Sequence, residues 1–211
     1  MIAIINYGIG NLNSISNAFK ALNGNAVVTS DPDLIRKADA VVLPGVGAFA
    51  DGMKNLHNMN LTGVLNDMVI KRKIPFLGIC LGMQFLAEIS YEYGETGGLG
   101  WIKGKIDKIK SVESVYKVPH IGWNDVHLKA DDFVLFQGLG KSSTFYFVHS
   151  YYFIPDKSEE DCIAGITHYS TDMVTMVQKN HIFGVQFHPE KSQGAGLTLL
   201  NNFINYIKTN G

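Results

Sequence analysis

The sequence predicts an α/β fold with a mostly parallel central sheet, helices on both faces of that sheet, and extra antiparallel strands in the C-terminal half. Short apolar runs alternate with segments of helical periodicity through the first half of the chain. Two of these runs end in glycine-rich turns, and the second half is richer in strand-type segments. Strands that alternate with helices form parallel sheets whose faces the helices cover. The order of the segments therefore predicts the fold class.

The first elements follow from the apolar pattern. Residues 1–6 form a continuous apolar run, which is typical of a strand covered on both faces. Residues 12–22 place apolar side chains at helical spacing, and Gly24 is suited to end that helix. A second short strand is expected at residues 27–28. A short helix is expected from Pro32, because proline suits the first helical turn.

The next two strands both run into glycine-rich turns. Residues 40–43 form the third strand and lead into residues 44–47, with the sequence Pro-Gly-Val-Gly. A helical region at about 48–72 leads to the fourth strand, residues 75–79, which enters the turn at 78–82. Ligands collect at the carboxyl ends of the strands in parallel sheets. Both turns therefore lie where a functional site is expected.

The remaining elements complete the prediction. A helix is expected from Leu81 to about Ile89, and the glycine-rich segment 91–101 is expected to be an exposed loop. A closing helix is expected over 195–208. Composition typical of β-strands marks six segments: 104–109, 123–128, 145–149, 162–168, 173–178 and 182–187. No linker or internal repeat is evident, so residues 1–211 are expected to form one domain.

Composition excludes several classes of function. The 211 residues, 46% hydrophobic and 18% charged, have the balance of a globular protein, and the net charge of −1 comes without the basic stripe of a nucleic-acid binder. No apolar run reaches the length of about eighteen residues that a membrane span needs. Two cysteines, Cys80 and Cys162, are too few for a disulfide framework, so reduced thiols in a cytoplasmic protein are expected. Neither a metal nor a cofactor is expected, because no CxxC or HxxxH spacing occurs.

The turn Gly78-Ile79-Cys80-Leu81-Gly82 joins a predicted buried strand to a predicted helix. This is the layout of a nucleophile elbow with cysteine in place of serine, and the two glycines relieve crowding where the chain reverses. A cysteine at a helix N-terminus is also favoured as the thiolate. The alternative is a structural cysteine between packing glycines. The strand–turn–helix context favours the nucleophile, whereas Cys162 lacks this context and is interpreted as a core residue.

A cysteine nucleophile needs a base, and the base needs a third group to orient it. Among the seven histidines, His188 is favoured because it directly follows the predicted strand 182–187, and a proline then ends that strand. Glu190 is close enough in sequence to reach back to the imidazole and stabilise its charged form. His149 also follows an apolar strand but lacks a nearby carboxylate. The predicted triad is therefore Cys80, His188 and Glu190.

Two segments resemble motifs of the class I, or triad-type, glutamine amidotransferases. Residues 78–84 (GICLGMQ) resemble the nucleophile motif, and residues 184–190 (GVQFHPE) resemble the histidine–glutamate motif. Further segments resemble the glutaminase subunits of imidazole glycerol phosphate synthases: residues 6–11, 43–49, 118–124, 145–151 and 188–192. One departure is Asn6, where relatives often carry aspartate, and it lies outside the triad.

The resemblance implies a flavodoxin-like three-layer sandwich and a glutamine-hydrolysing activity. Cys80 would attack the side-chain amide of glutamine, and the resulting thioester would be hydrolysed to glutamate. The oxyanion would be held by the backbone N–H of Leu81 and by a second donor at Gly47 or Val46. The glutamine pocket would include two further residues, Gln84 and Gly45.

The resemblance also implies a partner. Ammonia would pass to a cyclase subunit with a (β/α)₈ barrel, which forms imidazole glycerol phosphate and aminoimidazole carboxamide ribonucleotide in histidine biosynthesis. Tyr151 and Lys191 are candidates for the docking face of this heterodimer. The alternatives are the same glutaminase chemistry serving a different synthase, another Cys-His-Glu hydrolase, and a catalytically silent binding subunit. The complete triad argues against the silent subunit.

Overall fold

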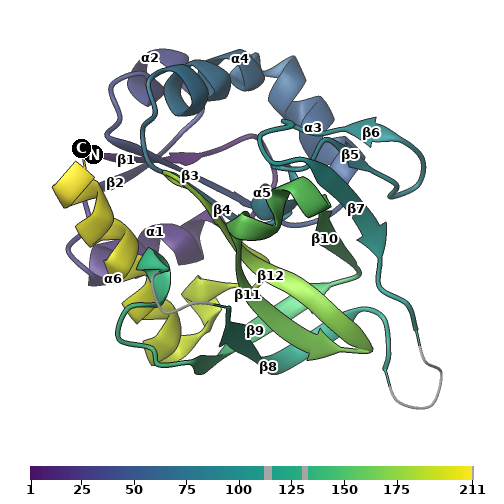
Figure 1. Cartoon of the computed structure of the whole chain (residues 1–211). Coiled ribbons are helices and arrows are strands. Elements are labelled where there is room, and N and C mark those ends of the chain that lie inside the picture. The colour runs from purple at the N-terminus through teal and green to yellow at the C-terminus, as the bar shows by residue number, and fades with distance from the viewer. Residues whose placement is uncertain (112–115, 130–132, 211) are drawn as a thin grey trace.

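The computed structural model describes residues 1–111, 116–129 and 133–210. In this part of the chain thirteen strands form one sheet with the order β2-β1-β3-β4-β13-β12-β10-β7-β5-β6, and β11, β8 and β9 branch from β12. Figure 1 shows helices on both faces of the first strands. This arrangement confirms the predicted α/β class with a mixed sheet.

The first five strands of the sheet order are parallel. Strand β1 lies between β2 and β3, β3 pairs with β4, and β4 pairs with β13, all in the same direction. The carboxyl ends of these strands consequently share one edge of the sheet. The bounds are β1 (Ile2–Ile5), β2 (Ala26–Thr29), β3 (Ala40–Gly45), β4 (Phe76–Cys80) and β13 (Ile182–Val185).

Two apolar cores lie on the two faces of this parallel sheet. In β1, Ala3 and Ile5 enter one core, whereas Ile2 and Ile4 enter the other, because successive side chains of a strand point to opposite faces. The first core is covered by α2 (Pro32–Ile35), α3 (Phe49–Asn58) and α4 (Leu61–Leu65), and the second by α1 (Leu12–Ala21) and α6 (Gln193–Asn210) (Figure 1). The sheet and the helices on its two faces therefore form three layers.

The second half adds antiparallel strands. Strand β12 pairs antiparallel with β13, β10 and β11, and β8 pairs antiparallel with β11 and β9. The additional bounds are β7 (Gly104–Lys108), β8 (His120–Leu128), β9 (Ser142–His149), β10 (Tyr151–Pro155), β11 (Ile163–Tyr169) and β12 (Thr171–Lys179). Strand β10 was not predicted, because it begins two residues after β9 ends.

The predicted helix from Leu81 to about Ile89 is wrong in extent. Helix α5 spans only Leu81–Gln84, and β5 (Ile89–Ser90) follows soon after. The backbone N–H groups of Leu99, Gly100 and Ile102 donate to carbonyls of residues 85–87, at 2.8–3.0 Å. These bonds satisfy the carbonyl groups that a longer helix would have used, so the chain leaves the helix early.

The segment 91–101, predicted as an exposed loop, is only partly exposed. It contains β6 (Thr96–Gly97), and both Glu92 and Trp101 are buried. The indole of Trp101 packs edge-on against Phe76 of β4. The predicted helical region 48–72 is also divided, with a break at Asn60 and a π-helical turn at Asn66–Lys71. No helix in the described ranges is long and apolar enough to cross a membrane.

Gly82→Ala should destabilise the protein by about 3 kcal/mol, because overpacking of a rigid core forces the backbone apart. An ideal Cβ at Gly82 would lie 1.7 Å from the carbonyl oxygen of Leu43 in β3. Urea unfolding measures the change. Gly63→Ala in α4 is the matched control, because in the described structure its Cβ meets no atom within 4 Å outside its own helix. This control should gain about 0.5–1 kcal/mol, and equal effects of the two substitutions would contradict the packing argument.

Candidate active site

The candidate nucleophile, Cys80, lies at the junction of β4 and α5. Its backbone has φ 54° and ψ −108°, a left-handed conformation that a residue with a side chain rarely adopts. An ideal Cβ at Gly78 would lie 2.5 Å from the carbonyl oxygen of Gly82, so the turn can close only with glycine at that position. Strain of this kind is typical of nucleophile elbows, and it presents the thiol at the carboxyl edge of the sheet.

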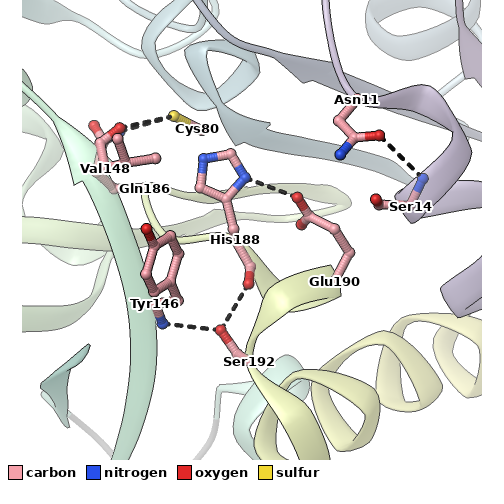
Figure 2. A network of polar contacts seen from close by, with 9 residues as sticks. All are labelled: Asn11, Ser14, Cys80, Tyr146, Val148, Gln186, His188, Glu190 and Ser192. Atoms are coloured by element: carbon pink, nitrogen blue, oxygen red, sulfur yellow. Dashed lines mark hydrogen bonds and ion pairs between the residues drawn. The ribbon is translucent and has the colours of Figure 1, made fainter. Parts of the chain in front are cut away.

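His188 is held by its backbone beside this edge. Its N–H donates to the carbonyl of Tyr146 in β9 at 2.9 Å, and its own carbonyl accepts from the Ser192 hydroxyl at 2.6 Å. The same hydroxyl accepts from the Tyr146 N–H at 3.0 Å (Figure 2). These three bonds fix the position of the histidine after β13.

The imidazole of His188 contacts a carboxylate on one side and faces the thiol on the other. Its Nδ1 lies 2.8 Å from Glu190 Oε1, and the two side chains are 4% and 2% exposed. Figure 2 shows the opposite ring nitrogen directed toward Cys80. Among the described residues, neither His188 Nε2 nor Glu190 Oε2 has a hydrogen-bond partner. The structure thus brings the three predicted triad residues together.

Electrostatics favour a charged imidazole in this position. Burial alone would lower the pKa of His188, but the neighbouring Cys80 and Glu190 groups outweigh burial and raise it to about 10. At neutral pH the ring therefore carries both protons, and Nε2–H is available to donate. A thiolate beside an imidazolium is the arrangement needed for nucleophilic attack followed by protonation of a leaving group.

His149, the rival base, is occupied by other contacts. Its Nδ1 lies 2.9 Å from the carbonyl oxygen of Tyr151, and its Nε2 lies 2.9 Å from Nδ1 of His120. Burial lowers the pKa of His149 to about 3, so the ring is neutral and both its nitrogens are already paired. This occupancy leaves His188 as the candidate base.

The predicted oxyanion loop lies next to the thiol. In the pairing of β3 with β4, Gly45 is opposite Cys80, and the chain then turns through Val46 and Gly47, which has φ +98°. Val46 and Gly47 line a cavity of about 350 Å³ together with Cys80 and Leu81. Gly45 instead packs beneath the phenol of Tyr7, where an ideal Cβ would lie 2.1 Å from the hydroxyl oxygen.

Gln84 lines the same cavity with a defined orientation. Its Nε2 donates to the carbonyl of Tyr151 at 2.9 Å and to Oε1 of Gln186 at 3.1 Å. Both amide hydrogens are used in these two bonds. The group that Gln84 can present to a ligand is therefore its carbonyl oxygen. Tyr151, predicted at the docking face, also lines this cavity.

Two residues of the site were missed by the sequence analysis. Glu92 lines the cavity, and its Oε2 accepts from the Phe49 N–H at the start of α3 at 2.7 Å. Burial raises the pKa of this carboxyl group, although the Phe49 N–H opposes the shift. Gln186, which lies inside the histidine–glutamate motif at residues 184–190 but was given no role, donates from Nε2 to Cys80 Sγ at 3.6 Å. Glu92 lies in a segment without periodicity, so no local pattern could have identified it.

Residues that could hold a metal ion are not gathered at this site. Within residues 1–111, 116–129 and 133–210, no group of three or more histidine, cysteine, aspartate or glutamate side chains is arranged to bind one. The chemistry that the arrangement supports is attack by a thiolate on an acyl carbon, with one imidazolium as the proton carrier.

This chain is similar to known proteins over nearly its whole length. The family model described as glutamine amidotransferase class-I matches residues 3–206. Imidazole glycerol phosphate synthase subunit HisH 1 of Methanococcus maripaludis is 48% identical over 98% of this chain and 100% of its own length. Subunit HisH 2 of the same organism is 46% identical over 97% and 98%. Subunit HisH of Pelagibacter ubique is 44% identical over 97% and 99%.

Solved structures share the fold at low sequence identity. A crystal structure of a glutamine amidotransferase has a TM-score of 0.75 at 17% identity and covers 99% of this chain and 100% of that chain. A glutamine amidotransferase from Thermotoga maritima has a TM-score of 0.61 at 18% identity and covers 99% and 84%. At this low sequence identity, these solved structures show only that the chain has the same fold.

The pKa of His188 should fall when either group that raises it is neutralised. We expect Cys80→Ala and Glu190→Gln each to lower it, because each removes one of the two neighbours that oppose burial. Nitrogen-15 NMR of the ring during a pH titration measures the change, with the exposed His127 as internal control. An unchanged His188 titration in both variants would contradict the proposed charge arrangement.

The raised pKa of His188 also determines how the free energy of unfolding changes with pH. A raised folded-state pKa means that the bound proton stabilises the folded protein fully below the unfolded value of about 6.5. That contribution is lost as the pH rises toward about 10.

Proposed function

The chain belongs to the class-I glutamine amidotransferase family, and we propose that it is the glutaminase subunit of an imidazole glycerol phosphate synthase in histidine biosynthesis. The observation that carries the proposal is the Cys80–His188–Glu190 arrangement in a chain 48% identical, over nearly its full length, to a HisH subunit. The reaction is hydrolysis of L-glutamine to glutamate and ammonia. A reduced thiol at Cys80 is required, which is consistent with the cytoplasm as the compartment.

The first half-reaction forms a thioester. The Cys80 thiolate attacks the side-chain carbonyl carbon of glutamine, a C–S bond forms, and the carbonyl oxygen becomes an oxyanion. We propose the N–H groups of Leu81 and of Val46 or Gly47 as the donors that stabilise that charge, and one such donor contributes about 3 kcal/mol. His188 then gives its Nε2 proton to the departing nitrogen as the C–N bond breaks. Ammonia leaves and a glutamyl thioester remains.

The second half-reaction regenerates the enzyme. Neutral His188 accepts a proton from a water molecule as that water attacks the thioester carbon. The C–S bond breaks, glutamate leaves, and the thiolate–imidazolium pair is restored. Glu190 accepts the Nδ1–H bond throughout, which keeps the ring oriented with Nε2 toward the reacting atoms.

The cavity offers groups suited to the amino-acid end of glutamine. Glu92 presents a buried carboxylate with one oxygen held by the Phe49 N–H. An ammonium group placed beside this carboxylate would offset the unfavourable burial that raises its pKa. The free carbonyl oxygen of Gln84 is a second acceptor in the same cavity. These two acceptors favour a substrate that carries a positive charge.

The ammonia-accepting partner is proposed to dock on the outer face of β8. Ile121 and Trp123 are 58% and 49% exposed there, so two large apolar side chains lie exposed close together on one strand. Trp123 packs edge-on against Tyr146, and the Lys191 ammonium lies 5.7 Å from the centre of the Tyr146 ring. This patch adjoins the turn that carries Glu190. We propose that a cyclase subunit with a (β/α)₈ barrel covers it and receives ammonia.

A second candidate function keeps the chemistry and changes the acceptor. Methanococcus maripaludis has two HisH proteins, and both are similar to this chain, at 48% and 46% identity. A duplicated glutaminase is free to serve another synthase. Expression of this chain in a histidine auxotroph that lacks its own glutaminase subunit separates the two functions. Growth without histidine supports the first function, and failure to grow with glutaminase activity intact supports the second.

Cys80→Ala should abolish glutamine-dependent synthesis by the complex and leave synthesis from added ammonia unchanged. The substitution removes the nucleophile, whereas ammonia supplied directly bypasses the glutaminase. Both rates are measured on the reconstituted complex with the cyclase substrate, and the wild-type chain alone should hydrolyse glutamine slowly. Retention of glutamine-dependent synthesis by Cys80→Ala would refute the nucleophile assignment.

Ile121→Asp should weaken binding of the cyclase subunit at least about tenfold, because it places a charge in the centre of the proposed apolar contact. Ile70→Asp is the matched control, since Ile70 is 44% exposed on the turn after α4. Titration calorimetry with the partner measures both affinities. Equal affinities of the two variants would place the partner on another surface.

A further inference from the structure

A continuous chain of hydrogen bonds joins β8 to the sulfur of Cys80. It begins at Asn124, passes through His120 and His149 to the carbonyl oxygen of Tyr151, and continues through two glutamine amides. The successive distances are 3.3 Å from Asn124 to His120, 2.9 Å from His120 to His149, and 2.9 Å from His149 to Tyr151. From the Tyr151 oxygen to Gln84 the distance is 2.9 Å, from Gln84 to Gln186 it is 3.1 Å, and from Gln186 to the sulfur it is 3.6 Å.

The donor and acceptor in each hydrogen bond between Asn124 and the Tyr151 carbonyl can be assigned by starting from either end of this part of the chain. Asn124 Nδ2 also donates to the His168 carbonyl at 3.2 Å, and its Oδ1 accepts from the Asp125 N–H at 2.8 Å, which fixes the orientation of the amide. His120 Nε2 must therefore accept, so its proton is on Nδ1. His120 Nδ1–H then donates to His149 Nε2.

The other end of the imidazole pair gives the same assignment. The Tyr151 carbonyl can only accept, so His149 donates to it from Nδ1–H, and its Nε2 is left to accept from His120. Each ring thus carries one proton and is neutral. Burial lowers the pKa of His120 to about 4 and that of His149 to about 3, which agrees with two neutral rings. Stacking of His120 between Phe147 and Tyr169 holds the pair in place.

The amide part of the chain is also fixed in direction. The Tyr151 oxygen accepts from both His149 and Gln84, and this shared acceptor orients the Gln84 amide. Gln84 then donates to Gln186 Oε1, which leaves the Gln186 amide nitrogen facing the sulfur. An N–H group directed at sulfur stabilises the thiolate more than the thiol.

We propose that His120 and His149 are positioning residues for the glutaminase reaction, acting through the Tyr151 carbonyl and the two glutamine amides on the Cys80 sulfur. The inference rests on the proposed function. It assigns a role to the histidine that the triad leaves unused. Neither ring touches the reacting atoms in this role. Their contribution is to hold the donor that favours the thiolate.

The test compares two substitutions at one position. His149→Leu fills a similar volume without a donor, whereas His149→Asn places an amide N–H near the position of Nδ1 and can still donate to Tyr151. The first readout is the rate at which iodoacetamide alkylates Cys80 at neutral pH. The second is kcat and KM for glutamine in the complex with the cyclase subunit. His127→Leu, at an exposed site on β8, the strand that carries His120, is the control.

His149→Leu should slow alkylation about tenfold and lower kcat about 100-fold with a smaller change in KM, the size expected when a reacting group is misplaced by about 1 Å. His149→Asn should stay within about threefold of wild type, His127→Leu should be unchanged, and synthesis from added ammonia should persist in all three. Wild-type alkylation by His149→Leu overturns the proposal. Equal losses in both His149 variants, with ammonia-dependent synthesis lost too, would show a purely structural role and also overturn it.

The two readouts separate failure of this inference from failure of the proposed function. If the wild-type complex does not hydrolyse glutamine, the proposed function fails. The alkylation comparison still decides whether the histidine pair acts on the Cys80 sulfur, because alkylation requires neither glutamine nor the partner.

Discussion

The close approach of α5 to β3 at Gly82 is the contact on which the site depends. At this point the helix backbone lies so near the Leu43 carbonyl that no side chain fits between them. To reach that position directly after β4, the chain must turn within one residue, and Cys80 takes a left-handed conformation at φ 54°. Packing of the surrounding core supplies the energy that maintains this strain. The thiol is therefore presented at the sheet edge as a consequence of how the core is filled.

Strand pairing then brings the second half of the site to this thiol. Strands β4 and β13 are parallel, with Ile79 opposite Val185, so the residues that follow each strand emerge at the same edge. Cys80 is the last residue of β4, and His188 lies three residues beyond the end of β13. A shift of the register by one residue would turn every side chain of β13 to the opposite face. The register therefore determines whether His188 reaches Cys80.

The two buried histidines near the sulfur differ in how their hydrogen bonds are satisfied. Both nitrogens of His149 are paired with protein groups, and burial keeps its ring neutral. His188 has a carboxylate on one nitrogen, while the other has no partner among the residues described. A histidine whose two ring nitrogens are both hydrogen-bonded to protein groups can keep its neighbours in position. A histidine with one unpaired ring N–H can instead transfer a proton. This difference, and not burial alone, separates the roles that we propose for His149 and His188.

The sequence alone predicts the alternating strands and helices of the first half, the elbow at Cys80 and the pairing of His188 with Glu190, because each depends on residues close together in the chain. It did not determine the end of α5, the burial of Glu92 or the amide–imidazole chain through His149. Those features depend on carbonyl and N–H groups from segments far apart in sequence. Such partners meet only after the sheet has formed, so these features could be identified only in the folded protein.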